Sequence, residues 1–175
     1  MNKKNIYCPL CSGKFESKVI EPDETLRLVC KECGYTHFQN PTPTVLAIIE
    51  KGDQLLLVKR KYDPYKGEWD IPGGFLEVGQ NLEDAIKAEI KEELGVGVKS
   101  ATYFKSTVSF YQTKYKVENI VGAAFKVEVD SYDFVPGSDV LEVKFFDIND
   151  LPPIAPLKDV VESVNKLIKE KKNEK

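Results

Sequence analysis

The sequence predicts an α/β protein in which a small cysteine-rich module precedes a domain built as an α/β/α sandwich with a mixed sheet. Two Cys-x-x-Cys pairs lie close to the N-terminus. Further on, apolar runs typical of β-strands flank one segment with helical periodicity, and a second helical segment lies near the C-terminal end. Strands on both sides of a helix, followed by a second helix, are typical of a sheet packed between helices.

Composition limits the classes of function. Hydrophobic residues make up 42% of the 175 residues and charged ones 30%, as in ordinary globular proteins. The net charge of -3, without a basic stripe, disfavours nucleic acid as a partner. No apolar run approaches the roughly 20 residues of a membrane span, and the first residues lack the apolar segment of a signal peptide. We therefore expect a cytoplasmic protein without a membrane partner.

The four cysteines predict a structural zinc site. The two pairs are separated by 18 residues, close to the spacing of zinc ribbons. Two disulfides are the alternative, which a reducing compartment disfavours. Four thiolates close the coordination shell, so the metal would support folding and leave no position for a reacting water. The predicted ligands are Cys8, Cys11, Cys30 and Cys33.

The chain then divides. We expect the zinc ribbon to cover residues 1–40 and the second domain residues 44–172, because two prolines at positions 41 and 43 interrupt regular structure. The expected strands of the second domain are 45–50, 54–60, 97–111, 116–129 and 140–148. The first two should form one hairpin and the next two a long hairpin. The apolar spacing of residues 157–171 predicts the last helix.

The central helix has clear end signals. Asn81 is expected as N-cap, Asp84 stands where a capping box has its acid, and Gly95 is a left-handed stop, so the helix should run from Leu82 to Leu94. At about 100° per residue, three glutamates fall on the arc of the apolar residues of the first turn. These are Glu89, Glu92 and Glu93.

The three glutamates predict a metal site. A solvated face is the alternative for an acidic helix, but three carboxylates turned inward are costly unless a cation neutralises them. Clusters of carboxylate oxygens suit Mg²⁺ or Mn²⁺. Gly73 and Gly74 precede the helix, let the backbone approach it closely and could aim a carbonyl at the same ion. A diphosphate held by that ion is the expected substrate.

The same stretch resembles the Nudix box, G-x5-E-x7-R-E-U-x-E-E-x-G-U, where U is a bulky aliphatic residue. Gly74 opens the pattern, whereas Gln80 and Ala88 stand where the pattern has Glu and Arg. The second half of the pattern is filled by Glu89, Ile90, Glu92, Glu93, Gly95 and Val96. The approach to the box, a G-x-W-x-x-PGG segment, is also similar to that of the family.

The resemblance implies a Nudix-type pyrophosphohydrolase that uses Mg²⁺ or Mn²⁺ to cleave the pyrophosphate bond of a small nucleotide, a nucleoside diphosphate linked to another group. Its implied metal ligands are Glu89, Glu92, Glu93 and the carbonyl of Gly73. The same glutamates, or a carboxylate from a later segment, would be catalytic. Glu118, Asp139 and Glu142 are the later candidates, and Glu142 ranks first because it precedes the last strand. Lys59, Arg60 and Lys61 are expected to be a solvated strand end.

A zinc ribbon ahead of a Nudix domain is similar to the arrangement in the NADH pyrophosphatase group. Residues 97–129 lack the SQPWPFPxS motif of that group, which favours ADP-ribose or a nucleotide sugar over NADH and NAD-capped RNA. Zinc ribbons in similar proteins help to form dimers, so a homodimer is compatible with the resemblance. The alternative is a catalytically weak nucleotide-binding or sensor module, because Gln80 and Ala88 depart from the box. If Glu and Arg pair in the family, losing both leaves no uncompensated buried charge.

Overall fold

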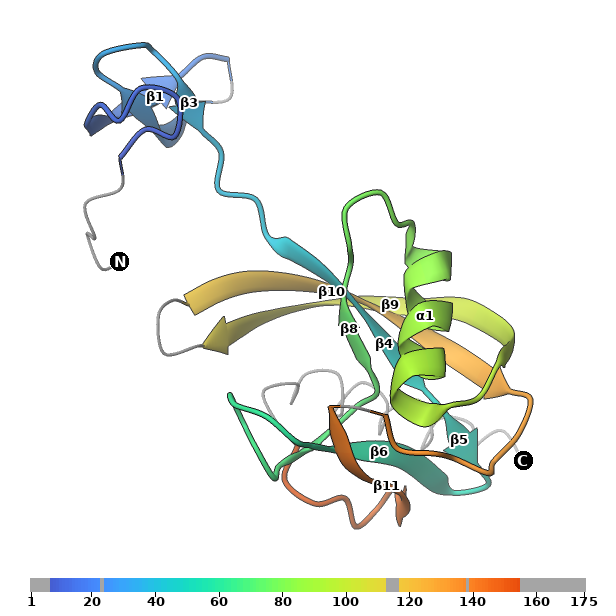
Figure 1. Ribbon diagram of the computed structural model, residues 1–175. Coiled ribbons are helices and arrows are strands. Elements are labelled where there is room, and N and C mark those ends of the chain that lie inside the picture. Colours follow the sequence, from blue (N-terminus) through green and yellow to red (C-terminus); the bar gives the residue numbers. More distant parts are fainter. Residues whose placement is uncertain (1–6, 23, 113–116, 138, 155–175) are drawn as a thin grey trace. The chain divides into compact units, whose positions relative to one another are not determined.

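The computed structural model describes residues 7–22, 24–112, 117–137 and 139–154. The chain divides between Asn40 and Pro41 into two compact units, each described below by itself (Figure 1). The expected helix at 157–171 lies outside the described residues, and so does most of the turn between the two long strands.

The first unit is a small antiparallel sheet in the order β1-β2-β3. Its strands are β1 (Phe15–Ile20), β2 (Thr25–Cys30) and β3 (Thr36–His37). The two cysteine pairs lie in tight turns, in which Ser12 N–H donates to the carbonyl of Cys8 and Gly34 N–H donates to that of Cys30. His37 packs against the ring of Phe15 at a centroid distance of 5.8 Å, in keeping with a structural role for this histidine.

In the described part of the second unit there are two sheets and one helix, α1 (Leu82–Leu94) (Figure 1). Its strands are β4 (Thr42–Ile48), β5 (Glu50–Lys51), β6 (Gln54–Arg60), β7 (Trp69–Asp70), β8 (Gly73–Phe75), β9 (Val98–Gln112), β10 (Val117–Val129) and β11 (Val140–Asp147). One sheet has the order β8-β4-β10-β9, and the other has the order β11-β6-β5 with β7 also paired to β6. The β4–β10 pair is parallel and the others are antiparallel. The predicted α/β class with a mixed sheet is confirmed.

The first predicted hairpin is wrong over most of its length. Of the segment expected to pair with β6 in this hairpin, only the short β5 does so, at Glu50 and Lys51. Strand β4 instead lies between β10 and β8 in the other sheet. The apolar run predicted the strand correctly, but residues 45–49 are buried on both faces and alternate between two hydrophobic cores, so the pattern does not identify the pairing partner. The long hairpin of β9 and β10 is confirmed.

Helix α1 begins and ends where its end signals predict. The side chain of Asn81 accepts the N–H of Asp84 at 2.7 Å, and Gly95 adopts a left-handed conformation with φ of 72°. Asp84 accepts from the side-chain amide of Asn81, and not from the backbone N–H expected in a capping box. Ile86 and Ile90 anchor the helix in the core over β4. Among the described residues, no helix is long and apolar enough to cross a membrane.

The segment before β11 is bonded to the end of α1. Val135 N–H donates to the carbonyl of Leu94, and Gly137 N–H donates to that of Glu93, each at 2.9 Å. These bonds satisfy carbonyls that have no partner inside the helix. A Cβ at position 137 would overlap the backbone of Glu92, so this close approach requires glycine. The segment is thereby held beside the acidic end of the helix, with Asp139 next to it.

Candidate active site

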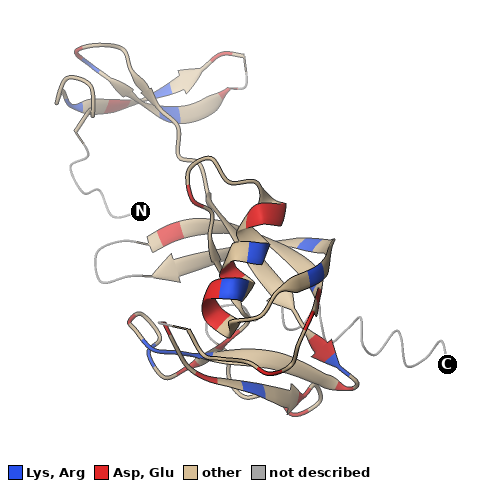
Figure 2. Cartoon of the chain, turned by 45° about the vertical axis from the view of Figure 1, so that its right-hand side comes forward, with Lys and Arg blue, Asp and Glu red and all other residues tan. Residues whose placement is uncertain are grey.

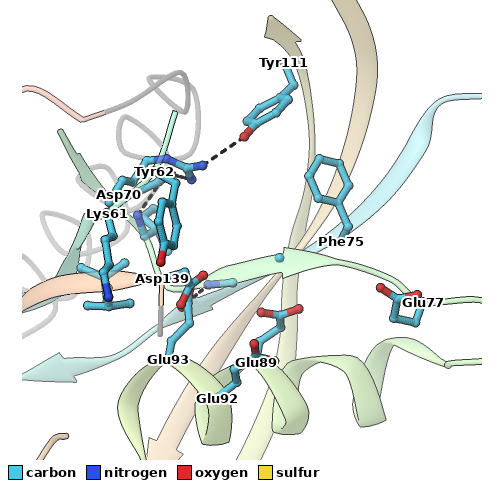
Figure 3. A pocket seen from close by; sticks show the side chains of 16 residues that line it. Lys61, Tyr62, Asp70, Phe75, Glu77, Glu89, Glu92, Glu93, Tyr111 and Asp139 are labelled. Atoms are coloured by element: carbon cyan, nitrogen blue, oxygen red, sulfur yellow. Dashed lines mark hydrogen bonds and ion pairs between the residues drawn. The ribbon is translucent and has the colours of Figure 1, made fainter. Parts of the chain in front are cut away.

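A cavity of about 430 Å³ lies between α1 and the strands β6, β8 and β9 (Figure 3). Its volume falls in the range typical of small-molecule sites. One wall carries the glutamates of α1 together with Asp139, and another carries Arg60 and Tyr111. Figure 2 shows acidic and basic residues together on α1. The two lysines of the helix, Lys87 and Lys91, are exposed and do not line the cavity. The glutamates that line the cavity are therefore distinct from the exposed lysines of the helix.

The three glutamates of the helix all line this cavity, at different depths. Glu93 is 6% exposed, and its Oε2 accepts the N–H of Gly73 at 2.9 Å. Glu89 is half-buried, and Glu92 is exposed at the rim. The expected inward orientation therefore holds for two of them, while the third reaches the cavity from its edge.

Burial makes ionised carboxylates unfavourable here. It raises the pKa of Glu89 to about 7, with further contributions from the charges of Glu92, Asp139 and Glu77. Burial also raises the pKa of Glu93 well above its usual value, against the opposing effect of the Gly73 N–H. The donor set consists of carboxylate oxygens, which suit a hard divalent cation. The donor chemistry of these residues therefore suits the divalent metal that the sequence predicts, whereas among the described residues only the four cysteines bring three or more ligand atoms close enough together to hold an ion.

The two glycines before the helix serve different purposes. Gly73 has φ of 147°, and a Cβ there would overlap the carbonyl oxygen of Val45 in the neighbouring strand. A Cβ on Gly74 would instead overlap the carboxylate of Glu89. Gly73 is thus required by the sheet, and Gly74 by the position of one carboxylate.

Arg60 forms the other wall of the cavity. Its Nη1 donates to Asp70 Oδ2 and its Nη2 donates to the hydroxyl of Tyr111, both at 3.0 Å (Figure 3). Its Nε donates to the carbonyl of Pro64 at 3.1 Å. Burial raises the pKa of Asp70 to about 6, although the charge of Arg60 opposes this. The expectation of a solvated strand end is therefore wrong for Arg60. Pairing of β6 with β7 creates this contact, and a local sequence pattern does not report such a pairing.

The later carboxylates differ in position. Asp139 lines the cavity. Glu142 lies on β11, where its carboxylate is 3.7 Å from Lys59 Nζ and its side chain is 49% exposed. Among the described residues, neither Glu142 nor Glu118 belongs to the cavity lining. The structure thus brings Asp139 to the glutamates of α1 and leaves the first-ranked candidate, Glu142, outside.

The two departures from the Nudix box also lie outside the lining. Gln80 Oε1 accepts the N–H of Glu77 at 2.9 Å, which closes the turn before α1. Ala88 is exposed on the helix. An arginine at position 88 would be solvated, so the argument from buried charge does not apply there.

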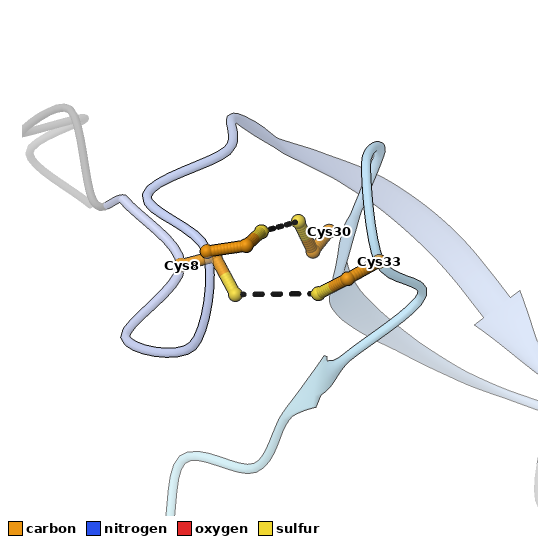
Figure 4. Close-up of side chains that lie close together, drawn as sticks. Cys8, Cys30 and Cys33 are labelled. Atoms are coloured by element: carbon orange, nitrogen blue, oxygen red, sulfur yellow. Dashed lines mark hydrogen bonds between the residues drawn. The ribbon is translucent and has the colours of Figure 1, made fainter.

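The four cysteines converge in the first unit (Figure 4). Their sulfur atoms all lie within 4.8 Å of one another, with Cys8 Sγ 3.6 Å from Cys33 Sγ and Cys11 Sγ 3.4 Å from Cys30 Sγ. Four ligands at zinc–sulfur distances of about 2.3 Å place sulfur atoms roughly 3.8 Å apart in a tetrahedron. No disulfide joins them. The cluster therefore fits a tetrahedral metal and does not support the alternative of two disulfides.

Comparison with known families gives two matches. The model of the NUDIX domain matches residues 40–169, and the model of the Nudix N-terminal zinc ribbon matches residues 6–39. The first match covers most of the chain and includes the whole candidate site.

Individual proteins agree with these matches. An ADP-ribose pyrophosphatase from Methanocaldococcus jannaschii is 37% identical over 123 residues, 69% of this chain and 70% of that protein. The NAD-capped RNA hydrolase NudC of Vibrio parahaemolyticus is 27% identical over 151 residues, which are 86% of this chain but 54% of the relative. A NUDIX hydrolase structure from Nitrosomonas europaea, 27% identical, has a TM-score of 0.70 and covers 95% of this chain and 92% of its own.

The two glycines give a matched test of the site. Gly74→Ala should weaken Mn²⁺ binding at least tenfold, with a loss of stability below about 1 kcal/mol, because only a flexible carboxylate must move. Gly73→Ala should cost about 2–4 kcal/mol, because it strains the backbone and overlaps a carbonyl. Urea denaturation and calorimetric titration with Mn²⁺ measure the two effects. Equal stability losses in the two variants would contradict this assignment.

Removing the buried charge should stabilise the metal-free protein. A carboxyl group whose pKa is higher in the folded protein stabilises the fold while it is protonated. This contribution is fully present below the pKa of the unfolded chain, near 4.5, and is lost as pH rises through the pKa of the folded protein. In buffers without added magnesium or manganese, Glu93→Gln should therefore be about 1–2 kcal/mol more stable than wild type at pH 8, and the difference should shrink at pH 5.

Urea denaturation at the two pH values checks this expectation. The exposed Glu83→Gln is the matched control and should leave stability nearly unchanged. A Glu93→Gln protein less stable than wild type at both pH values would show that the bond from Gly73 to the carboxylate outweighs the cost of burial.

Proposed function

Because this chain belongs to the Nudix family, we propose that it is a divalent-metal-dependent enzyme that hydrolyses the pyrophosphate bond of a nucleoside diphosphate linked to another group. The observation that carries the proposal is the convergence of Glu89, Glu92 and Glu93 on one cavity beside Gly73. The predicted combination of a Nudix domain with a zinc ribbon is confirmed. The names of two relatives, ADP-ribose pyrophosphatase and NAD-capped RNA hydrolase, support the same class of reaction.

The site residues have distinct roles in this proposal. Glu89, Glu92 and Glu93, with the carbonyl of Gly73, would hold Mg²⁺ or Mn²⁺. When bound, the cation neutralises the diphosphate and acidifies a water molecule. The bond from Gly73 N–H fixes the carboxylate of Glu93. Asp139, which lines the cavity, is better placed than Glu142 to accept a proton from that water.

We favour ADP-ribose or a nucleotide sugar as the substrate. The relative named ADP-ribose pyrophosphatase is 37% identical, whereas the NAD-capped RNA hydrolase is 27% identical and is covered over only 54% of its length. The SQPWPFPxS motif is also absent from residues 97–129. Both features favour the smaller substrate over NADH or capped RNA.

A hydrolysis panel tests the reaction. It contains ADP-ribose, a nucleotide sugar, NADH and NAD-capped RNA, each with Mg²⁺ or Mn²⁺, and products are separated by ion-exchange chromatography. We expect cleavage of ADP-ribose or the nucleotide sugar, and a fall in kcat of at least 100-fold in Glu92→Gln and Glu93→Gln, because each removes a ligand charge from the cation. Glu83→Gln should match wild type.

The panel also separates the enzyme from the catalytically weak module. The enzyme hypothesis would be rejected if wild type and both glutamine variants had equal and negligible turnover while calorimetry still showed nucleotide binding. The protein would then be a nucleotide-binding module. Preferred cleavage of NADH or capped RNA would overturn the substrate class while leaving the reaction type intact.

We also propose that the cysteine cluster holds structural zinc. Metal analysis should find one zinc ion per chain, and Cys11→Ser should lose it, because three thiolates leave the shell incomplete. Amide signals of residues 7–40 should then lose their dispersion in NMR spectra, while those of the second unit persist. Stoichiometric zinc in Cys11→Ser would contradict the four-cysteine site.

The remaining partner assignments stay predictions. A homodimer would double the mass measured by light scattering at micromolar concentration. Cytoplasmic location and the absence of nucleic acid among the partners are likewise expectations from the sequence.

A further inference from the structure

We propose that Arg60 and Tyr111 form an anion-binding subsite that holds a substrate phosphate on the wall of the cavity away from the glutamates. The proposal rests on the proposed hydrolysis of a nucleoside diphosphate derivative. Both residues line the cavity, and Figure 3 shows Tyr111 and Glu92 projecting from opposite sides of it. The substrate would therefore be held at two places, by a cation at the glutamates and by hydrogen-bond donors at this subsite.

The available hydrogen-bond donors indicate an anionic ligand. Nη1 and Nη2 of an arginine carry two N–H groups each, and in Arg60 one group of each pair is used, by Asp70 and by Tyr111. One N–H on each nitrogen remains, and guanidinium N–H groups are suited to phosphate oxygens. Tyr111 accepts its bond from Arg60 and so retains its own O–H for donation. With 28% of its side-chain surface exposed, Arg60 is accessible from the cavity.

The surroundings hold these donors in place. Asp70 is largely buried, and its other oxygen accepts the N–H of Ile71 at 2.9 Å, so it anchors Arg60 from the protein side. The ring of Tyr111 packs edge-on against Tyr65 and Phe75 at centroid distances of 6.0 and 5.5 Å. Lys61 adds a second cation to the lining. A preorganised arrangement of donors loses little entropy when a phosphate binds.

A purely structural role is the competing interpretation. Arg60 lies on β6 and Tyr111 on β9, so their hydrogen bond joins the two sheets. A clamp of this kind would stabilise the fold without affecting ligand affinity. Stability and affinity must therefore be measured on the same variants.

The test uses Arg60→Lys and Tyr111→Phe. The first keeps the charge and removes the guanidinium group, and the second removes only the hydroxyl. Matched controls are Arg27→Lys, the other arginine of the chain, in the first unit, and Tyr103→Phe, an exposed tyrosine on the same strand as Tyr111. For each protein, ADP affinity is measured by calorimetry with Mg²⁺ present, steady-state kinetics are measured with ADP-ribose, and the unfolding midpoint is measured in urea.

We expect Arg60→Lys to weaken ADP binding at least tenfold and Tyr111→Phe to weaken it roughly threefold to tenfold, with KM rising more than kcat falls. The controls should stay within twofold of wild type. ADP affinities of both variants within twofold of wild type would overturn the subsite, and so would a wild type that does not bind ADP. If Arg60→Lys does not fold, Tyr111→Phe decides. ADP binding without hydrolysis of ADP-ribose would overturn the proposed reaction and still test the subsite.

Discussion

Glu93 joins the two segments that build the candidate site. Its carboxylate is buried beneath the glycine strand and accepts the N–H of Gly73, so the position of α1 and the path of β8 depend on each other. Burial of this carboxyl group is costly in its ionised form. Among the described residues, no ion pair joins Glu93 to a cationic side chain, and Arg60 is paired with Asp70. The fold thus accepts an unfavourable charge at the position where the proposed metal would offset it.

Packing around this bond leaves little freedom. Strand β4 is buried on both faces and pairs with β8 on one side and β10 on the other, which fixes the glycine segment over the helix. At the far end of α1, the bonds from Val135 and Gly137 to the last carbonyls hold the following segment. Asp139 therefore follows a segment that is held by backbone hydrogen bonds, at a close approach that requires glycine at position 137.

The sequence predicts those features of the structure that depend on interactions between residues close together in the chain. Asn81 and Gly95 fix the ends of α1 through bonds within a few residues, so the helix and the direction of its glutamates could be read from the sequence. Arg60, Tyr111 and Asp139 reach the cavity from separate strands and segments, and no spacing in the sequence records that approach. For the same reason the sequence does not show that Glu142, its first-ranked candidate base, lies outside the cavity lining, since the position of Glu142 depends on the register of β11. The pairing of β4 was also missed, because an apolar run buried on both faces fits several partners.

The hydrogen bond between Arg60 and Tyr111 has a consequence for how this site can change over evolution. Arg60 belongs to one sheet and Tyr111 to the other, and apolar side chains between the sheets, such as Leu46 and Leu57, set the spacing of the two walls. A methyl group gained or lost in that core would widen or narrow the cavity without altering any residue that lines it. The width of the cavity therefore depends partly on the hydrophobic core, where comparison of the lining residues alone would not find it.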